Sequence, residues 1–153
     1  LTSAMKITNK QAIDTVNILF QACEKGNFGL VKHLIENGAN GVNVHSKDRI
    51  GGSLLHYACK NGHNNIVNYL LKNGANPSAE GYCKWTPLHV ACEMGFYETA
   101  KDLIANGADI YAQDTDGITP LIATCVGIAP NLSIIKLLLK DIHVNDTQCG
   151  YNN

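Results

Sequence analysis

Apolar residues recur along the chain at the spacing of three and four positions that places them on one face of an α-helix. The pattern is clear over residues 30–35 and again over 66–71. An Asn-Gly-Ala triplet follows each segment, with Gly38 or Gly74 at its centre, and a third triplet contains Gly107. A glycine after a helical pattern is typical of a left-handed helix C-terminus. We therefore predict a series of helices that end at these glycines.

A second, shorter helical pattern precedes each of these segments. Its four copies align so that Leu19, Leu55, Leu88 and Leu121 share one column, spaced by 36, 33 and 33 residues. The aligned stretches read ILFQACEKG, LLHYACKNG, PLHVACEMG and PLIATCVG. A regular period of this length indicates stacked units, each of which packs on its neighbours.

The start of each short helix carries its own signals. Thr86 and Thr119 can cap a helix through their hydroxyl groups, and each is followed by a proline. Proline suits the first helical position because an N–H there has no helical partner. Ser53 holds the same place one unit earlier. The polar stretches before these starts, such as 113–117, are too short for an ordinary pair of strands, so we expect tight projecting turns.

Helix, helix and turn repeated about every 33 residues, with TPLHVA opening one unit, resembles the ankyrin repeat. The resemblance covers roughly residues 13–145. It implies an all-α solenoid of stacked helix-turn-helix units, whose β-hairpin or turn tips project to one side. The repeats are expected at about 8–43, 44–79, 80–112 and 113–146.

The first and fourth units depart from the pattern. The first lacks Thr-Pro, and we expect its helix to begin near Thr8, with Gln11 as a capping-box partner. The fourth has Ile122 in place of histidine, carries extra residues within 127–131 and lacks the Asn-Gly-Ala stop. Its second helix is therefore expected to be displaced or to end irregularly.

The two ends lie outside the predicted repeats. Residues 1–7 are interpreted as an N-terminal tail, in which Leu1 to Ala4 precede the first methionine and can be a non-native remnant. Residues 147–153 are interpreted as a C-terminal tail. Within it, Gly150 falls 33 residues after Gly117, as at the start of a fifth repeat. We expect a fragment of a longer array.

Charge and composition narrow the classes of partner. The 153 residues have a formal net charge of -1 and a sequence pI near 6.6, which provides no basic surface for nucleic acid. The longest apolar runs fall far short of the roughly 20 residues that span a bilayer, so we expect no membrane insertion. Six cysteines are too dilute for a disulfide framework, and four lie in helical patterns. We expect a cytoplasmic protein, with the nucleus as the alternative.

Two His-x-x-Cys pairs, His56 with Cys59 and His89 with Cys92, contain the residue types of a tetrahedral zinc site. Neighbouring helices pack with axes about 8–10 Å apart, whereas zinc needs every ligand within about 2.0–2.3 Å. The cysteine column also continues through Cys23, where no histidine accompanies it. We predict that these cysteines are packing residues, and we expect no metal and no cofactor.

The histidines also have an alternative. In ankyrin proteins the histidine of this motif bonds to the threonine three residues earlier and to the backbone of the adjacent unit. Ser53 with His56, and Thr86 with His89, have that spacing. A catalytic Ser-His or Cys-His pair is the alternative, but no orienting group or nucleophile motif accompanies it. We expect no enzyme activity.

Ankyrin proteins typically bind partner proteins through the turn tips and the exposed face of the first helices. Carried onto this sequence, the resemblance implies a set of candidate contact residues on these turns and helices: Lys47, Arg49, Tyr57, Lys60, Tyr82, Trp85, Val90, Glu93, Met94, Asp114 and Ile118. Trp85 is expected to anchor an aromatic patch with Tyr57, Tyr82 and Met94. The alternative is that Trp85 packs locally on its own hairpin.

The sequence thus predicts a non-catalytic, monomeric module that binds a protein or peptide partner. A first alternative is a regulatory or targeting segment of a larger enzyme or channel whose catalytic domain lies outside this chain. A second alternative is a spacer within a long array that has no partner of its own.

Overall fold

The computed structural model describes residues 3–38 and 41–146, with side chains described for 10–38 and 41–140. Eight α-helices and one short 3-10 helix follow one another within these ranges. They are α1 (Ser3–Lys25), α2 (Phe28–Asn37), α3 (Leu54–Lys60), α4 (Asn64–Lys72), η2 (Tyr82–Lys84), α5 (Pro87–Glu93), α6 (Tyr97–Ala105), α7 (Pro120–Val126) and α8 (Leu132–Asp146).

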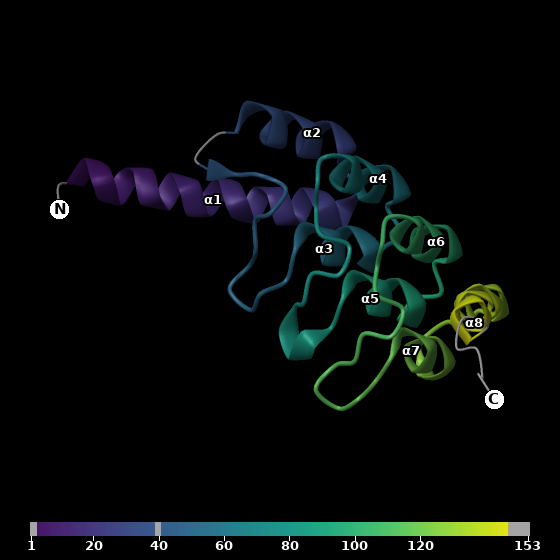
Figure 1. Ribbon diagram of the computed structural model, residues 1–153. Coiled ribbons are helices and arrows are strands. Elements are labelled where there is room, and N and C mark those ends of the chain that lie inside the picture. Colours follow the sequence, from purple (N-terminus) through teal and green to yellow (C-terminus); the bar gives the residue numbers. More distant parts are fainter. Residues whose placement is uncertain (1–2, 39–40, 147–153) are drawn as a thin grey trace.

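The helices form two rows (Figure 1). The inner row is α1, α3, α5 and α7, the outer row is α2, α4, α6 and α8, and each helix contacts its neighbours in the row and its partner in the pair. The connecting turns project on one side of the stack. No strand occurs among the described residues, although Lys47 and Ser53 form one isolated antiparallel bridge. The predicted all-α solenoid with projecting turns is confirmed.

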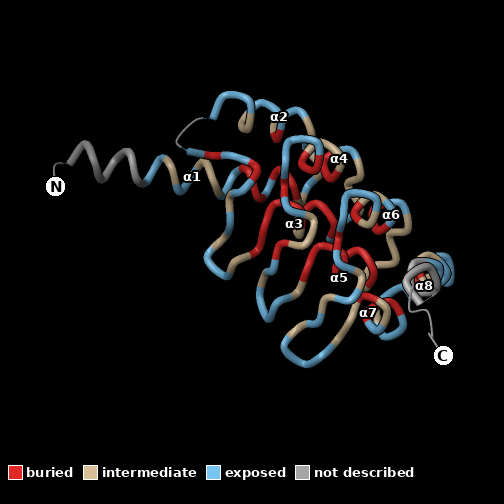
Figure 2. Tube along the Cα trace, in the orientation of Figure 1, coloured by how far each residue is buried: buried red, intermediate tan, exposed pale blue. Residues whose placement is uncertain are grey.

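The core lies between the two rows, where Figure 2 shows a continuous band of buried residues. The aligned leucines supply its centre, since Leu19, Leu55 and Leu88 are at most 1% exposed. Full burial of each such side chain contributes about 1.5–3 kcal/mol to folding. Because α3 and α5, which carry Leu55 and Leu88, each contact the inner helix before and the inner helix after, the period in the sequence becomes a continuous core.

Glycines allow the units to approach one another. Gly62, which follows α3, has a φ of +67°, a conformation that residues with a Cβ rarely adopt. A Cβ placed there would lie 2.8 Å from the ring of Phe96 in the next unit. The predicted stops at Gly38, Gly74 and Gly107 are likewise left-handed, with φ values of 54°, 87° and 88°.

The first helix corrects a prediction. It begins at Ser3 and not near Thr8, so its observed start lies within the segment interpreted as a tail. No proline or glycine stands between the two positions, and the segment contains Ala4, Met5 and Lys6, which are good helix formers. In the fourth unit α8 runs for 15 residues, against nine in α4 and α6, because no glycine ends it earlier.

Candidate functional site

The turn before α3 is organised by one carboxylate. Asp48 accepts hydrogen bonds at Oδ1 from the backbone N–H groups of Ile50 and Gly52, both at 2.8 Å. Its Oδ2 accepts a bond from the Tyr57 hydroxyl on α3 at 2.7 Å. Burial raises the pKa of Asp48, but these bonds, which stabilise the ionised form, outweigh burial and leave the pKa lowered. The bond to Asp48 is also the main reason that the pKa of Tyr57 rises to about 12.

The turn before α5 has a different construction. Gly81 stands where the neighbouring turns have Asp48 and Asp114, one 33-residue period away on either side. Glycine has no carboxylate, and the chain forms η2 in its place, with Cys83 and Lys84 at φ values of 53° and 62°. The Gly81 N–H donates to the Trp85 carbonyl at 2.8 Å and closes the turn.

His56 and His89, which occupy the same position of the repeat, join these turns to the helices. The Ser53 N–H donates to Nδ1 of His56 at 3.0 Å, so Nδ1 is the unprotonated nitrogen and Nε2–H donates to the Trp85 carbonyl at 2.8 Å. His89 makes the corresponding contacts with the Thr86 N–H at 3.2 Å and the Ile118 carbonyl at 2.9 Å. The bonds expected from the resemblance are confirmed.

Both histidines are held in their neutral form. Burial is the main reason that the pKa values of His56 and His89 are lowered, although the backbone bonds act in the opposite direction. Because both ring nitrogens of each histidine already have partners, neither offers a lone pair to a metal or a proton acceptor to a substrate. These contacts identify the pair as structural.

The cysteines of the same column are buried thiols. Cys23, Cys59 and Cys92 are fully buried, and desolvation raises the pKa of Cys23 to about 12 and that of Cys92 to about 11. Burial also raises the pKa of Cys59. A thiol that stays protonated is a poor nucleophile and a poor metal ligand. Among the described residues no group of three or more His, Cys, Asp or Glu side chains could hold a metal ion.

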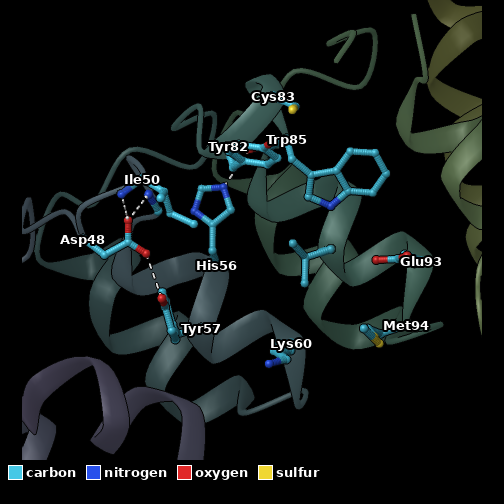
Figure 3. A pocket seen from close by; sticks show the side chains of 12 residues that line it. Asp48, Ile50, His56, Tyr57, Lys60, Tyr82, Cys83, Trp85, Glu93 and Met94 are labelled. Atoms are coloured by element: carbon cyan, nitrogen blue, oxygen red, sulfur yellow. Dashed lines mark hydrogen bonds between the residues drawn. The ribbon is translucent and has the colours of Figure 1, made fainter. Parts of the chain in front are cut away.

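A groove of about 420 Å³ lies between the turns and the inner helices of the second and third units. Figure 3 shows its side chains converging from α3, η2 and α5. Its apolar lining consists of Ile50, Tyr57, Tyr82, Trp85, Val90 and Met94. The polar lining includes Asp48, Lys60 and Glu93. An open, mainly apolar groove with a few polar groups has the character of a binding surface.

Most of the candidate contact residues meet in this groove. Those that line it are Tyr57, Lys60, Tyr82, Trp85, Val90, Glu93 and Met94. Lys47 and Arg49 line a second groove, which also contains Asp48, Ile50 and Tyr57 and so adjoins the first. Asp114 and Ile118 line neither groove. Asp114 instead accepts the N–H groups of Asp116 and Ile118 at Oδ1, as Asp48 does in its own turn.

Trp85 has both of the roles that the sequence left open. Its ring lies 4.7 Å from that of His89, at an interplanar angle of 32°, so it packs on the helix that follows its own turn. It is also only partly buried and forms part of the groove wall. Local packing therefore orients the indole without removing it from the surface.

Sequence reasoning missed several apolar members of the combined surface. Ile50 is 63% exposed and belongs to both grooves, while Ile13 and Val16 of α1 line the second. Ile50 could have been found as the apolar residue within a polar turn. Ile13 and Val16 could not have been found in this way, because the turn before α3 lies next to α1 only in the folded chain.

Only some of the charged side chains on this surface form ion pairs. Lys60 forms an ion pair with Glu24 of α1 at 2.8 Å, which occupies its ammonium group. Arg49 and Glu93 form no ion pair with any side chain that the structure describes, and Lys47 makes a single bond of 3.5 Å to the Glu80 carbonyl. The grooves thus present a free cationic side and a free carboxylate.

No helix within the described ranges is long and apolar enough to cross a membrane.

Comparison with known proteins agrees with the geometry. No curated protein sequence matches the chain. The family model of ankyrin repeats matches it in three overlapping copies, at residues 3–81, 19–114 and 88–152, and so covers almost its whole length. The chain belongs to the ankyrin repeat family.

Proposed function

We propose that this protein is a non-catalytic module that binds a partner protein or peptide in the groove between its second and third units. Ankyrin repeats are generally protein-protein interaction modules, and their domains are typically non-catalytic. The observation that carries the proposal is the apolar groove itself, since it leaves large apolar side chains such as Tyr82 and Ile50 exposed to solvent.

The lining favours recognition of protein surfaces. Tyr82 is 68% exposed and Ile50 is 63% exposed, and both line the groove together with the partly buried Trp85 and Met94. Aromatic residues and methionine are enriched at the centres of protein interfaces, where a few of them supply most of the binding energy. The groove therefore combines a fixed base with exposed side chains that a partner can cover.

Hydrogen bonds connect the groove walls to one another. The turn of Asp48 is held by its carboxylate, and the turn of Gly81 is tied to the next one because the Thr115 N–H donates to the Cys83 carbonyl at 3.0 Å. His56 connects the two turns across the groove through the Trp85 carbonyl. A surface that is ordered before binding loses little conformational entropy when a partner docks.

The proposal is tested by capture from an extract of cells that make the protein. The protein is immobilised as wild type, as the Tyr82→Ala, Met94→Ala double variant and as Tyr111→Ala, and retained proteins are quantified by mass spectrometry. Tyr111 is an exposed tyrosine (49%) that lines neither groove, which makes it a matched control.

Partners of the groove should be lost, by about tenfold or more, from the double variant and retained by the Tyr111→Ala protein. Equal unfolding midpoints would establish that the double variant is folded. If all three proteins retain the same partners equally, the groove is not the binding surface. The regulatory-segment and spacer alternatives, the cytoplasmic location and the monomeric state stay predictions.

A further inference from the structure

We propose that the groove receives a short extended peptide whose bulky apolar side chain is followed or preceded, about three residues away, by an acidic residue on the side of Lys47 and Arg49. This inference rests on the proposed function and specifies the chemistry of the partner. It is carried by the distribution of charge on the two sides of the apolar groove.

The apolar walls of the groove determine which side chains of the peptide fit it. Trp85, Val90 and Met94 form an uncharged wall on the α5 side, and Ile50 faces them from the neighbouring turn. An open groove of about 420 Å³ accommodates one or two apolar side chains of a partner, which is the number that a short extended segment presents on one face.

The side toward α1 is cationic. Lys47 and Arg49 are both exposed, and they line the second groove that begins where the first ends, at Ile50 and Tyr57. Asp48 lies between them, but its oxygens already accept three hydrogen bonds. Two cations and one occupied carboxylate therefore leave a net positive turn that can bind a carboxylate.

The opposite side is anionic. Glu93 forms no ion pair with a described side chain, and with Asp114 and Asp116 of the turn before α7 it gives this side a net negative charge even when the exposed Lys84 of η2 is counted. An acidic residue of the partner is repelled from this side and attracted to the other. The charge pattern thus determines on which side of the groove the acidic residue of the peptide lies, as complementary charges do at protein interfaces.

The spacing follows from the geometry of the stack. Neighbouring helices lie about 8–10 Å apart, and an extended chain advances about 3.3 Å per residue. A peptide that crosses the inner helices therefore needs about three residues to pass from the wall of Trp85 to the turn that bears Arg49.

The test selects a phage-displayed library of random twelve-residue peptides on the immobilised protein. Selections are run on wild type, Arg49→Glu, Lys72→Glu and the Tyr82→Ala, Met94→Ala double variant. Lys72 at the end of α4 is exposed, lies outside both grooves and undergoes the same reversal of sign, so it is the matched control.

Peptides enriched on wild type should pair an apolar or aromatic residue with Asp or Glu two to four positions away. For one such synthetic peptide, Arg49→Glu should weaken binding about five- to tenfold in a fluorescence polarisation titration, whereas Lys72→Glu should leave it unchanged. Replacing the acidic residue of the peptide by Lys should restore binding to the Arg49→Glu protein.

The outcomes separate the two proposals. Two outcomes overturn the charge inference and keep the proposed function. In the first, enrichment depends on Tyr82 and Met94 but the selected peptides show no preference for Asp or Glu. In the second, the acidic preference is unchanged in the Arg49→Glu protein. The absence of any peptide that distinguishes wild type from the double variant overturns the peptide inference, whereas the capture experiment with the same double variant decides the proposed function. Sedimentation of the wild type and of Arg49→Glu tests for self-association. If the wild type self-associates and Arg49→Glu does not, a second copy of the chain occupies the groove and the peptide inference is wrong.

Discussion

The third and fourth units carry the same residues in different surroundings. Leu88 and Cys92 of α5 are fully buried, whereas Leu121 of α7 is only partly buried and Cys125 is exposed. α5 lies between α3 and α7, while the described contacts of α7 are with α5 and α8. The difference teaches that a residue in this fold is buried by the unit that follows it as much as by its own.

Cysteine reactivity should show the largest contrast between the units. In a Cys83→Ser, Cys149→Ser background, Cys125 should react with a thiol reagent at least about a hundredfold faster than Cys92, because Cys92 reacts only after local opening. Modified peptides are quantified over time by mass spectrometry. Comparable rates would mean that the interior units open as readily as α7.

Truncation of the leucine column should show the next largest effect. Leu88→Ala is expected to lower the free energy of unfolding by about 3–4 kcal/mol, through lost burial and a residual cavity. Leu121→Ala should cost about half as much, since Leu121 is only partly buried. Urea unfolding followed by circular dichroism measures both, and equal losses would contradict the comparison.

The histidine of the third unit should make stability depend on pH. The pKa of native His89 lies below the ordinary value near 6.5, so as pH falls through 6.5 the unfolded state takes up protons first. The free energy of unfolding should therefore fall from pH 7.5 to 5.5, and His89→Gln should reduce this dependence. Urea midpoints at the two pH values provide the measurement.

The fourth unit supplies the control for this pH effect. Ile122 occupies the histidine position and is 40% exposed. Ile122→His should therefore add much less pH dependence than His89 provides, because the position is far more exposed than that of the fully buried His89. If the free energy of unfolding of His89→Gln depends on pH as strongly as that of the wild type, a group other than His89 causes the dependence.

The smallest effect is expected from a hydroxyl group. Tyr57→Phe removes the bond to Asp48 and should cost about 1 kcal/mol, because the bond involves a charged acceptor but is only partly buried. Tyr82→Phe, at a side chain that is 68% exposed, should change stability by much less. Thermal unfolding compares them, and equal midpoints would mean that Asp48 finds another partner.

Local signals made the solenoid predictable. The helix starts at Thr86 and Thr119, the glycine stops and the histidine bonds each depend on residues close in sequence or one period away. The start of α1 was missed because Thr8 resembles a cap, although the helix propensity of the preceding residues continues the helix to Ser3. Cap signals are weak when no helix breaker supports them.

The candidate site was predictable in part. The resemblance to ankyrin repeats, carried along the period, placed Tyr57, Val90 and Met94 on the exposed face of the first helices and Trp85 on a turn tip, and these side chains do line one groove. The bond between Asp48 and Tyr57 could not be predicted in the same way. Asp48 falls on the 33-residue period with Gly81 and Asp114, but Val90 and Ala123, which stand at the positions that correspond to Tyr57, have no hydroxyl group, so the period gives no such bond.

The sequence by itself determined the number of units, their helices and the column in which each residue falls, because helix periodicity, caps and glycine stops act over a few residues. Only the tertiary structure decided which columns are covered, how η2 presents Tyr82 and how Ile13 and Val16 of α1 join Ile50 in one surface. These outcomes depend on contacts between units, and such contacts exist only when the chain is stacked.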